Sequence, residues 1–151
     1  AVAEEGMWKE INGGPAPRTS EEEVHSLLAA DRILIAKRGN RIVGSVCVQR
    51  LSPSLAEFGM LVAHPDCRGI GLGKALLNAA ENYGRAGGAE VMQLELLTPK
   101  TWEHPVKAFL HQWYTRIGYK PMKQEPFEKT YAALAEQLAA PCNFTIYHKK
   151  L

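Results

Sequence analysis

Hydrophobic and polar positions in the middle of the chain alternate in a way that favours β-strands. Two runs rich in β-branched residues, 33–36 and 42–48, flank the dipeptide Gly39-Asn40. This order predicts a β-hairpin, because Gly and Asn both accept the left-handed backbone of a two-residue turn. Another strand is expected over residues 56–62, with Gly59 inside it. Since glycine weakens strand pairing, it indicates a bulge or the close approach of another group.

Apolar residues elsewhere recur at helical intervals. Ser20 followed by three glutamates forms a capping-box pattern, which predicts a helix from there to about Ala30. Three more helices are predicted over residues 72–84, 105–117 and 129–139. The apolar positions that define the four helices are Val24, Leu27 and Leu28; Leu72, Ala75, Leu76, Ala79 and Tyr83; Phe109, Leu110, Trp113 and Ile117; and Tyr131, Leu134 and Leu138.

Strands predicted over residues 91–97, 119–123 and 143–147 complete the set, while residues 1–18 are interpreted as a loop because glycines and prolines interrupt them. The strand, helix and strand of residues 56–97 imply a parallel pair joined by a crossover. Neighbouring hairpin strands pair antiparallel. The pattern therefore predicts an α/β (α+β) fold: a mixed, mostly antiparallel twisted sheet with helices on both faces and one central βαβ crossover.

Composition narrows the class of protein. With 151 residues, 46% of them hydrophobic, the chain is expected to form one domain over residues 1–151. Its 18 basic and 16 acidic residues are mixed along the chain, which gives no basic stripe for nucleic acid. Three unpatterned cysteines favour free thiols in a reducing compartment. Without a long apolar run or a recognisable signal peptide, we expect a soluble, cytoplasmic protein with no membrane partner.

The run from Arg68 to Lys74, with glycine at every second position, is the strongest chemical signal. Glycines let backbone N–H groups converge on a ligand, and the predicted helix that follows turns its positive end to the same point. The run therefore indicates a phosphate-binding turn. A Walker A loop is excluded by Arg68 and Ala75, and a dinucleotide fingerprint by the alternating glycines and the spacer at residues 64–67. A purely structural turn stays open as the alternative.

Residues 68–73 match the Arg/Gln-x-x-Gly-x-Gly/Ala signature of the GNAT acetyltransferase superfamily, and residues 113–119 look like its aromatic-Tyr-x-x-x-Gly-aromatic segment. The chain resembles this family well over residues 33–120 and more weakly to residue 151. The resemblance implies an acetyl-CoA-dependent N-acetyltransferase that moves an acetyl group to an amine, of a small molecule, by direct attack in a ternary complex. A non-catalytic acyl-CoA-binding or regulatory module on the same fold is the alternative. The hypothesis of a nucleotide-dependent enzyme is weakened, because neither the Walker A motif nor the dinucleotide fingerprint is present.

The resemblance also assigns residues to acetyl-CoA. Backbone groups of Leu61, Val62 and Ala63 would hold the pantetheine arm. The pyrophosphate would be held by the amides of Arg68, Gly69, Ile70, Gly71, Leu72, Gly73 and Lys74. Tyr114 stands where the family has its general acid, and a protonated phenol can donate to the leaving CoA thiolate. The competing interpretation of Tyr114 is a core aromatic residue.

Glu57 is the candidate general base. It precedes Arg68 by eleven residues, which is the position of the catalytic glutamate in histone-type members of the family. Strand alternation sets it on the face opposite Phe58 and Met60. An exposed strand carboxylate, with water as the base, is the alternative. Glu95 could bind the ammonium group of the acceptor, and His111 could contact the acceptor. The alternative for His111 is a plain position on the helix surface. The five histidines show no metal-ligand spacing, so no metal site is expected.

Two features depart from the family pattern. Lys107 stands where the family often has an asparagine that contacts the CoA arm. The family's N-terminal strand has no recognisable counterpart before Ser20. Either residues before Ala1 complete the fold, which we favour, or residues 33–36 form an open sheet edge that faces solvent or a partner. A homodimer stays open.

Overall fold

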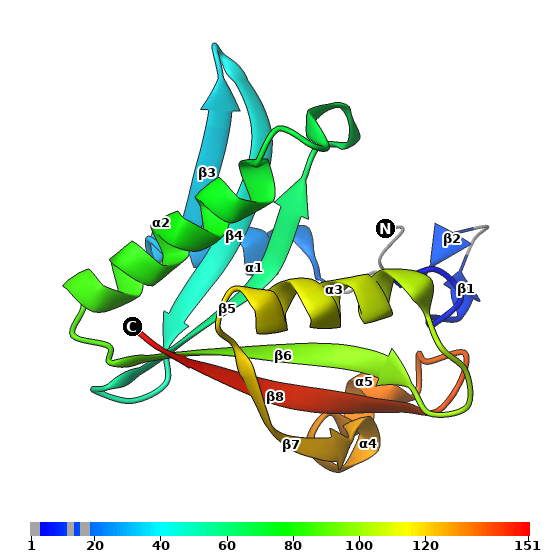
Figure 1. Cartoon of the computed structure of the whole chain (residues 1–151). Coiled ribbons are helices and arrows are strands. Elements are labelled where there is room, and N and C mark those ends of the chain that lie inside the picture. The colour runs from blue at the N-terminus through cyan, green and yellow to red at the C-terminus, as the bar shows by residue number, and fades with distance from the viewer. Residues whose placement is uncertain (1–3, 12–13, 16–18) are drawn as a thin grey trace. The chain divides into compact units, whose positions relative to one another are not determined.

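Figure 1 shows the computed structural model, which describes residues 4–11, 14–15 and 19–151. The chain divides into two compact units, and each is described by itself. The first, called the α2 unit, comprises residues 19–94 with 150–151; the second, the α3 unit, comprises residues 1–18 and 95–149. Six strands follow the hydrogen-bonded order β3 (Ile33–Arg38), β4 (Arg41–Arg50), β5 (Leu55–Ala63), β6 (Val91–Pro99), β8 (Cys142–Lys150) and β7 (Lys120–Pro126). Strand β6 (Val91–Pro99) gives its first residues to the α2 unit and the rest to the α3 unit.

The α2 unit contains the predicted hairpin and crossover. Its elements are α1 (Glu21–Ala29), β3 (Ile33–Arg38), β4 (Arg41–Arg50), β5 (Leu55–Ala63), the 3-10 turn η2 (Pro65–Cys67), α2 (Leu72–Ala86) and the start of β6. Strand β4 pairs antiparallel with both β3 and β5, and β5 pairs parallel with β6 from Leu55↔Val91 to Glu57↔Gln93. The prediction of a mixed, mostly antiparallel sheet with one βαβ crossover is therefore confirmed.

Local sequence signals account for the start of α1 and for the turn between β3 and β4. Gly39 has a φ of +62°, as the two-residue turn between β3 and β4 requires. The Ser20 hydroxyl accepts a hydrogen bond from the Glu23 amide at 3.1 Å, which confirms the predicted start of α1. No residue of α1 is buried, however, and Leu28 is exposed. The predicted apolar face of this helix therefore stays largely open.

Helix α2 packs on β3, β4 and β5, as Figure 1 shows. Gly44 of β4 permits this approach, because a Cβ there would lie 2.8 Å from the Val62 carbonyl oxygen and 2.9 Å from Leu76 Cδ1. The buried stripe of the helix consists of Leu76, Leu77, Ala80, Glu81 and Gly84. The predicted face was wrong at Ala75, Ala79 and Tyr83, which are exposed. Alanines occupy both faces of this helix, so hydrophobicity alone did not fix its rotation.

A bulge interrupts the pairing of β4 with β5. The register passes from Cys47↔Gly59 to Ser45↔Val62, so β5 carries one extra residue there. Gly59 predicted this irregularity, but the residue with the left-handed backbone is Met60, at φ +51°. The Met60 side chain is 45% exposed, whereas Phe58 is buried. The expectation that Met60 shares the face of Phe58 is therefore wrong, because the bulge breaks the alternation.

The α3 unit surrounds a core of aromatic and aliphatic side chains. Its elements are β1 (Glu10–Ile11), β2 (Gly14–Pro15), the rest of β6, α3 (Pro105–Arg116), β7 (Lys120–Pro126), α4 (Phe127–Thr130), α5 (Ala132–Ala135) and β8 (Cys142–Lys150) except its last residue. Strands β7 and β8 pair antiparallel. The core residues are Met7, Trp8, Leu97, Phe127, Leu138, Cys142 and Phe144.

Three sequence predictions fail in this unit. The N-terminal segment is not merely a loop: β1 pairs with β2, and Met7 and Trp8 are buried, although residues 1–3, 12–13 and 16–18 lie outside the described residues. The helix predicted over residues 129–139 is two short helices separated at Tyr131, whose ψ is 52°. In α3, Phe109 is 58% exposed, while Lys107 and Tyr114 are the buried residues. Each failure concerns a residue whose burial depends on distant partners.

Two absences hold for the described part of the chain. None of its helices is long and apolar enough to cross a membrane. No group of three or more His, Cys, Asp or Glu residues in the described ranges could hold a metal ion. Cys47, Cys67 and Cys142 are free thiols, as expected from their spacing.

Candidate functional site

The glycine run forms an exposed turn at the start of α2. Gly69 and Gly71 have φ values of +77° and +79°, and a Cβ on either would meet nothing within 4 Å. The backbone conformation, not crowding, therefore requires glycine at both positions. Gly71 is the N-cap and supplies no side-chain hydrogen bond to the first turn of the helix. The amides that begin this 15-residue helix consequently point outward with its positive dipole end, as an anion site requires.

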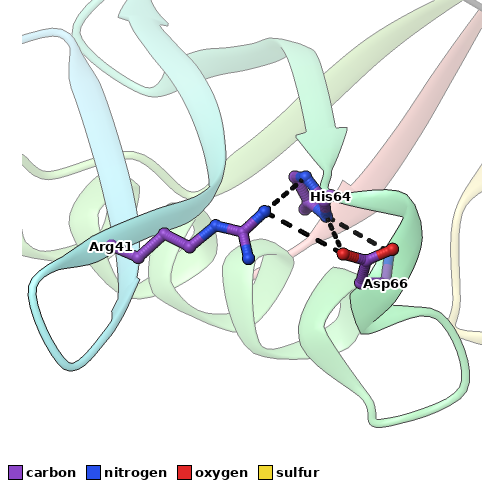
Figure 2. Close-up of polar contacts among 3 residues, drawn as sticks. All are labelled: Arg41, His64 and Asp66. Carbon is purple, nitrogen blue, oxygen red and sulfur yellow. Dashed lines mark hydrogen bonds and ion pairs between the residues drawn. The ribbon is translucent and has the colours of Figure 1, made fainter.

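Charged side chains stand near this turn. Arg68 and Lys74, at its two ends, are both exposed. Figure 2 shows a cluster just before it: Arg41 Nη2 lies 2.8 Å from His64 Nε2 and 3.9 Å from Asp66 Oδ2. His64 Nδ1 also lies 3.5 Å from Asp66 Oδ2. The backbone N–H of His64 donates to the Val43 carbonyl at 2.7 Å. The cluster ties the first residue of β4 to the segment that leads into the glycine turn.

The end of β5 carries the backbone expected to hold the pantetheine arm. Val62 lies opposite Ser45 of β4 and Ala63 lies opposite Gly44. In an antiparallel pair, every second residue directs its N–H and C=O away from the partner strand. This segment therefore offers backbone hydrogen-bonding groups on its other side, and the assignment of Leu61, Val62 and Ala63 remains a prediction.

Glu57 is fixed by hydrogen bonds to both of its carboxylate oxygens. Gln49 Nε2 donates to Oε1 at 2.9 Å, and Gln93 Nε2 donates to Oε2 at 2.7 Å. Arg32 Nη2 in turn donates to Gln49 Oε1. Glu57 is half-buried, on the face opposite the buried Phe58, as predicted. Each carboxylate oxygen has two acceptor positions, so these two bonds orient the group and leave it able to accept a proton.

Arg32, Gln49 and Gln93 are not among the site residues predicted from the sequence. Strand register brings the two glutamines beside Glu57, because Gln49 pairs with Glu57 on one side and Gln93 pairs with it on the other. The hairpin and the crossover were both predicted from the sequence. If the register of their three strands had also been predicted, it would have placed the side chains of Gln49, Glu57 and Gln93 in one row.

Tyr114 is a buried phenol of α3. Its side chain is 6% exposed, and its ring lies 5.1 Å from that of Trp113 and 6.1 Å from that of Tyr119. Burial raises the pKa of Tyr114 to about 12. The hydroxyl therefore keeps its proton throughout the neutral range, which suits a proton donor as well as a core residue.

The remaining candidates of the α3 unit each have a partner. Tyr131 Oη donates to Glu95 Oε2 at 2.6 Å, and His111 Nδ1 lies 2.7 Å from Tyr147 Oη. Burial raises the pKa of Tyr147, so that hydroxyl also stays protonated at neutral pH.

Lys107 forms a buried ion pair. Its Nζ lies 3.0 Å from Glu4 Oε1, and Trp8 Nε1 donates to Glu4 Oε2 at 2.8 Å. The residue that replaces the expected asparagine thus links α3 to the N-terminal segment.

The predicted site residues divide between the two units. The glycine turn, the end of β5 and Glu57 belong to the α2 unit, whereas Tyr114, Glu95 and His111 belong to the α3 unit. Within the units, the structure joins Glu57 to two glutamines and Glu95 to Tyr131.

A comparison with models of known protein families identifies one family. A model described as the acetyltransferase (GNAT) family matches residues 5–119, which include parts of both units. A search of curated protein sequences finds no match.

Several solved structures share the fold. Ard1 from Thermoplasma volcanium has 14% identity and a TM-score of 0.69, over 90% of this chain and 82% of that one. A GNAT family acetyltransferase from Elizabethkingia anophelis with acetyl-CoA bound has 15% identity and a TM-score of 0.67, over 94% and 95%. An aminoglycoside 6'-N-acetyltransferase complexed with coenzyme A has 15% identity and a TM-score of 0.67, over 85% and 78%. Identities this low show the fold alone.

Proposed function

Because the chain belongs to the GNAT acetyltransferase family, we propose that it is an acetyl-CoA-dependent N-acetyltransferase whose acceptor is a small-molecule amine. The observation that carries the proposal is the glycine turn at the start of α2, with its left-handed Gly69 and Gly71 and its uncapped amides. The aminoglycoside acetyltransferase among the similar folds supports a small amine as the acceptor class. The three free thiols favour a reducing setting such as the cytoplasm.

The turn fits a pyrophosphate. Its amides carry no side chain above them at Gly69 and Gly71, and Arg68 and Lys74 add positive charge at its ends. We assign the backbone from Arg68 to Lys74 to the pyrophosphate of acetyl-CoA. The outward backbone groups of Leu61, Val62 and Ala63 are assigned to the amides of the pantetheine arm.

The chemistry requires a proton acceptor and a proton donor. Acetyl-CoA supplies the acetyl group as a reactive thioester. An amine attacks it only in the neutral form, so Glu57 accepts a proton from the acceptor ammonium, directly or through water. Gln49 and Gln93 hold that carboxylate in one orientation. Tyr114, whose phenol is protonated at neutral pH, donates a proton to the departing thiolate. Glu95 and His111 are proposed contacts of the acceptor.

Calorimetric titration with acetyl-CoA tests the cofactor assignment. We expect saturable binding of acetyl-CoA and none of ATP or NAD at the same concentrations. Gly71→Val should raise the Kd for acetyl-CoA at least tenfold, because a β-branched residue disfavours φ +79° and covers the amides.

Gly39→Val is the matched control. Gly39 also has a positive φ and open space around it, but it lies in the β3–β4 turn. It should bear a similar strain and keep the affinity. Equal acetyl-CoA affinities for the two variants would contradict the assignment of the glycine turn.

A further inference from the structure

A cavity lies at the C-terminal end of α2, opposite the end that carries the glycine turn. Its volume is about 690 Å³, within the usual range for small-molecule sites, and it belongs entirely to the α2 unit. Tyr83, Gly84 and Gly87, at the C-terminal end of the helix, form one wall. The helix has 15 residues, which at 1.5 Å per residue separates this cavity from the glycine turn by roughly 20 Å. Figure 1 shows the two ends of α2.

Small apolar residues form the floor of the cavity. Ala56 and Ala89 are buried and contribute only methyl groups, and Gly84 contributes none. A Cβ on Gly84 would lie 3.0 Å from the Met92 methyl group, so helix and strand already touch behind it. The exposed Tyr83 ring stands at the side, held by a 3.0 Å hydrogen bond from its hydroxyl to the Asp31 carbonyl. This surface suits a flat apolar body.

The rim of the cavity is cationic. Arg32 and Arg50 line it, and no carboxylate does. Within the part of the chain that the structure describes, neither guanidinium has a carboxylate within ion-pair distance. Guanidinium groups bind carboxylates and phosphates through paired N–H donors, but an inorganic ion would leave the apolar floor without a contact. The lining therefore selects an organic anion.

One of these arginines reaches the candidate base. Arg32 donates to Gln49 Oε1, and Gln49, which also lines the cavity, donates to Glu57 Oε1. A ligand carboxylate that takes the Arg32 guanidinium removes the bond that orients the Gln49 amide. The hydrogen bond from Gln49 to Glu57 then loses its support.

We propose that this cavity binds a small carboxylate with a flat apolar body, and that its occupancy reorients Gln49 and Glu57. The cavity thus acts as an effector site on the α2 unit, separate from the glycine turn. The effect on catalysis rests on the proposed function, whereas the binding and the movement of Gln49 do not.

Titration of the full chain with 2-naphthoate tests the binding, followed by calorimetry and by backbone amide NMR signals. We expect one saturable site, with shifts at Gly84, Gly87 and Ala89, and unchanged affinity when acetyl-CoA is present. Naphthalene-2-methanol, which lacks the charge, should bind at least tenfold more weakly, and inorganic phosphate should cause no shift there. Displacement of 2-naphthoate by acetyl-CoA, or equal affinity for the neutral alcohol, would overturn the proposal.

Arg50→Met removes the exposed guanidinium and should weaken 2-naphthoate at least tenfold. Arg38→Met is its matched control, since Arg38 is an exposed arginine of β3 outside the cavity, and it should bind as the wild type does. The same loss in both variants would contradict a specific site.

The side-chain amide signals of Gln49 and Gln93 report the coupling. They should shift together as 2-naphthoate saturates, because Glu57 joins them. Signals that stay unchanged at saturation would refute the link to Glu57. These readouts need no acetyl transfer, so failure of the enzymatic function would leave them interpretable.

Discussion

The side chain with the most defined surroundings among the candidates is Glu57. Two glutamines donate to its two oxygens, and an arginine supports one of them. Such a row fixes the direction in which the carboxylate accepts a proton. The sequence predicted the residue and its face, but not its partners, because the partners depend on the register of three strands.

Replacing Glu57 by Gln should therefore lower kcat about 100-fold at neutral pH, since an amide of the same shape cannot accept the proton. Steady-state release of CoA measures this change. Glu95→Gln is the control, because Glu95 is a carboxylate of β6 assigned to acceptor binding; it should raise KM more than it lowers kcat. If Glu57→Gln keeps the wild-type kcat, the base is water and the assignment of Glu57 fails.

Tyr114 gives a prediction at alkaline pH. Its pKa is about 12 in the folded chain against 10 for an ordinary tyrosine, so the unfolded state releases this proton first. The stabilising effect is complete below pH 10 and disappears as the pH rises towards 12. Between pH 10 and 11 the wild type should lose about 1 kcal/mol more unfolding free energy than Tyr114→Phe, because half of the unfolded chains are already deprotonated at pH 10. Urea unfolding at both pH values measures the difference, and parallel losses would show that the phenol is not buried.

Elements formed by local signals were predictable, and elements formed by distant contacts were not. Gly39 and Ser20 determine a turn and a helix start within a few residues, so both were predicted. Met7 and Trp8 carry no periodic pattern, and only their contacts in the core of the α3 unit bury them. The break at Tyr131 is similar, because its ring packs against Phe127 and Phe144.

The Glu4–Lys107 pair connects α3 with the N-terminal segment inside the α3 unit. The two side chains are only 12% and 6% exposed, so removal of the cation leaves a carboxylate in a poorly solvated place. We expect Lys107→Met to lower the unfolding free energy by about 3 kcal/mol, measured with urea. Lys123→Met, which breaks the more exposed pair with Glu125, should cost less than about 1 kcal/mol. Equal costs would contradict the structural role of Lys107.

At the scale of the whole molecule, the family model includes parts of both units, and the sequence resemblance to the GNAT family is confirmed. The residues proposed for cofactor binding and proton acceptance come from one unit, and the proposed proton donor comes from the other. Acetyl-CoA could be predicted as the donor of the acetyl group because the motif of the glycine turn lies within seven consecutive residues, Arg68 to Lys74. The acceptor has no such local signature, since its proposed contacts, Glu95 and His111, come from different elements, β6 and α3.

The most direct test of the central claim is amine-dependent release of CoA from acetyl-CoA by the purified chain, followed with a thiol reagent over a panel of small amines. We expect turnover with at least one amine and a turnover at least tenfold lower in Tyr114→Phe, with the affinity for acetyl-CoA unchanged. Binding of acetyl-CoA without CoA release from any amine would contradict this claim and would identify a non-catalytic acyl-CoA-binding module instead.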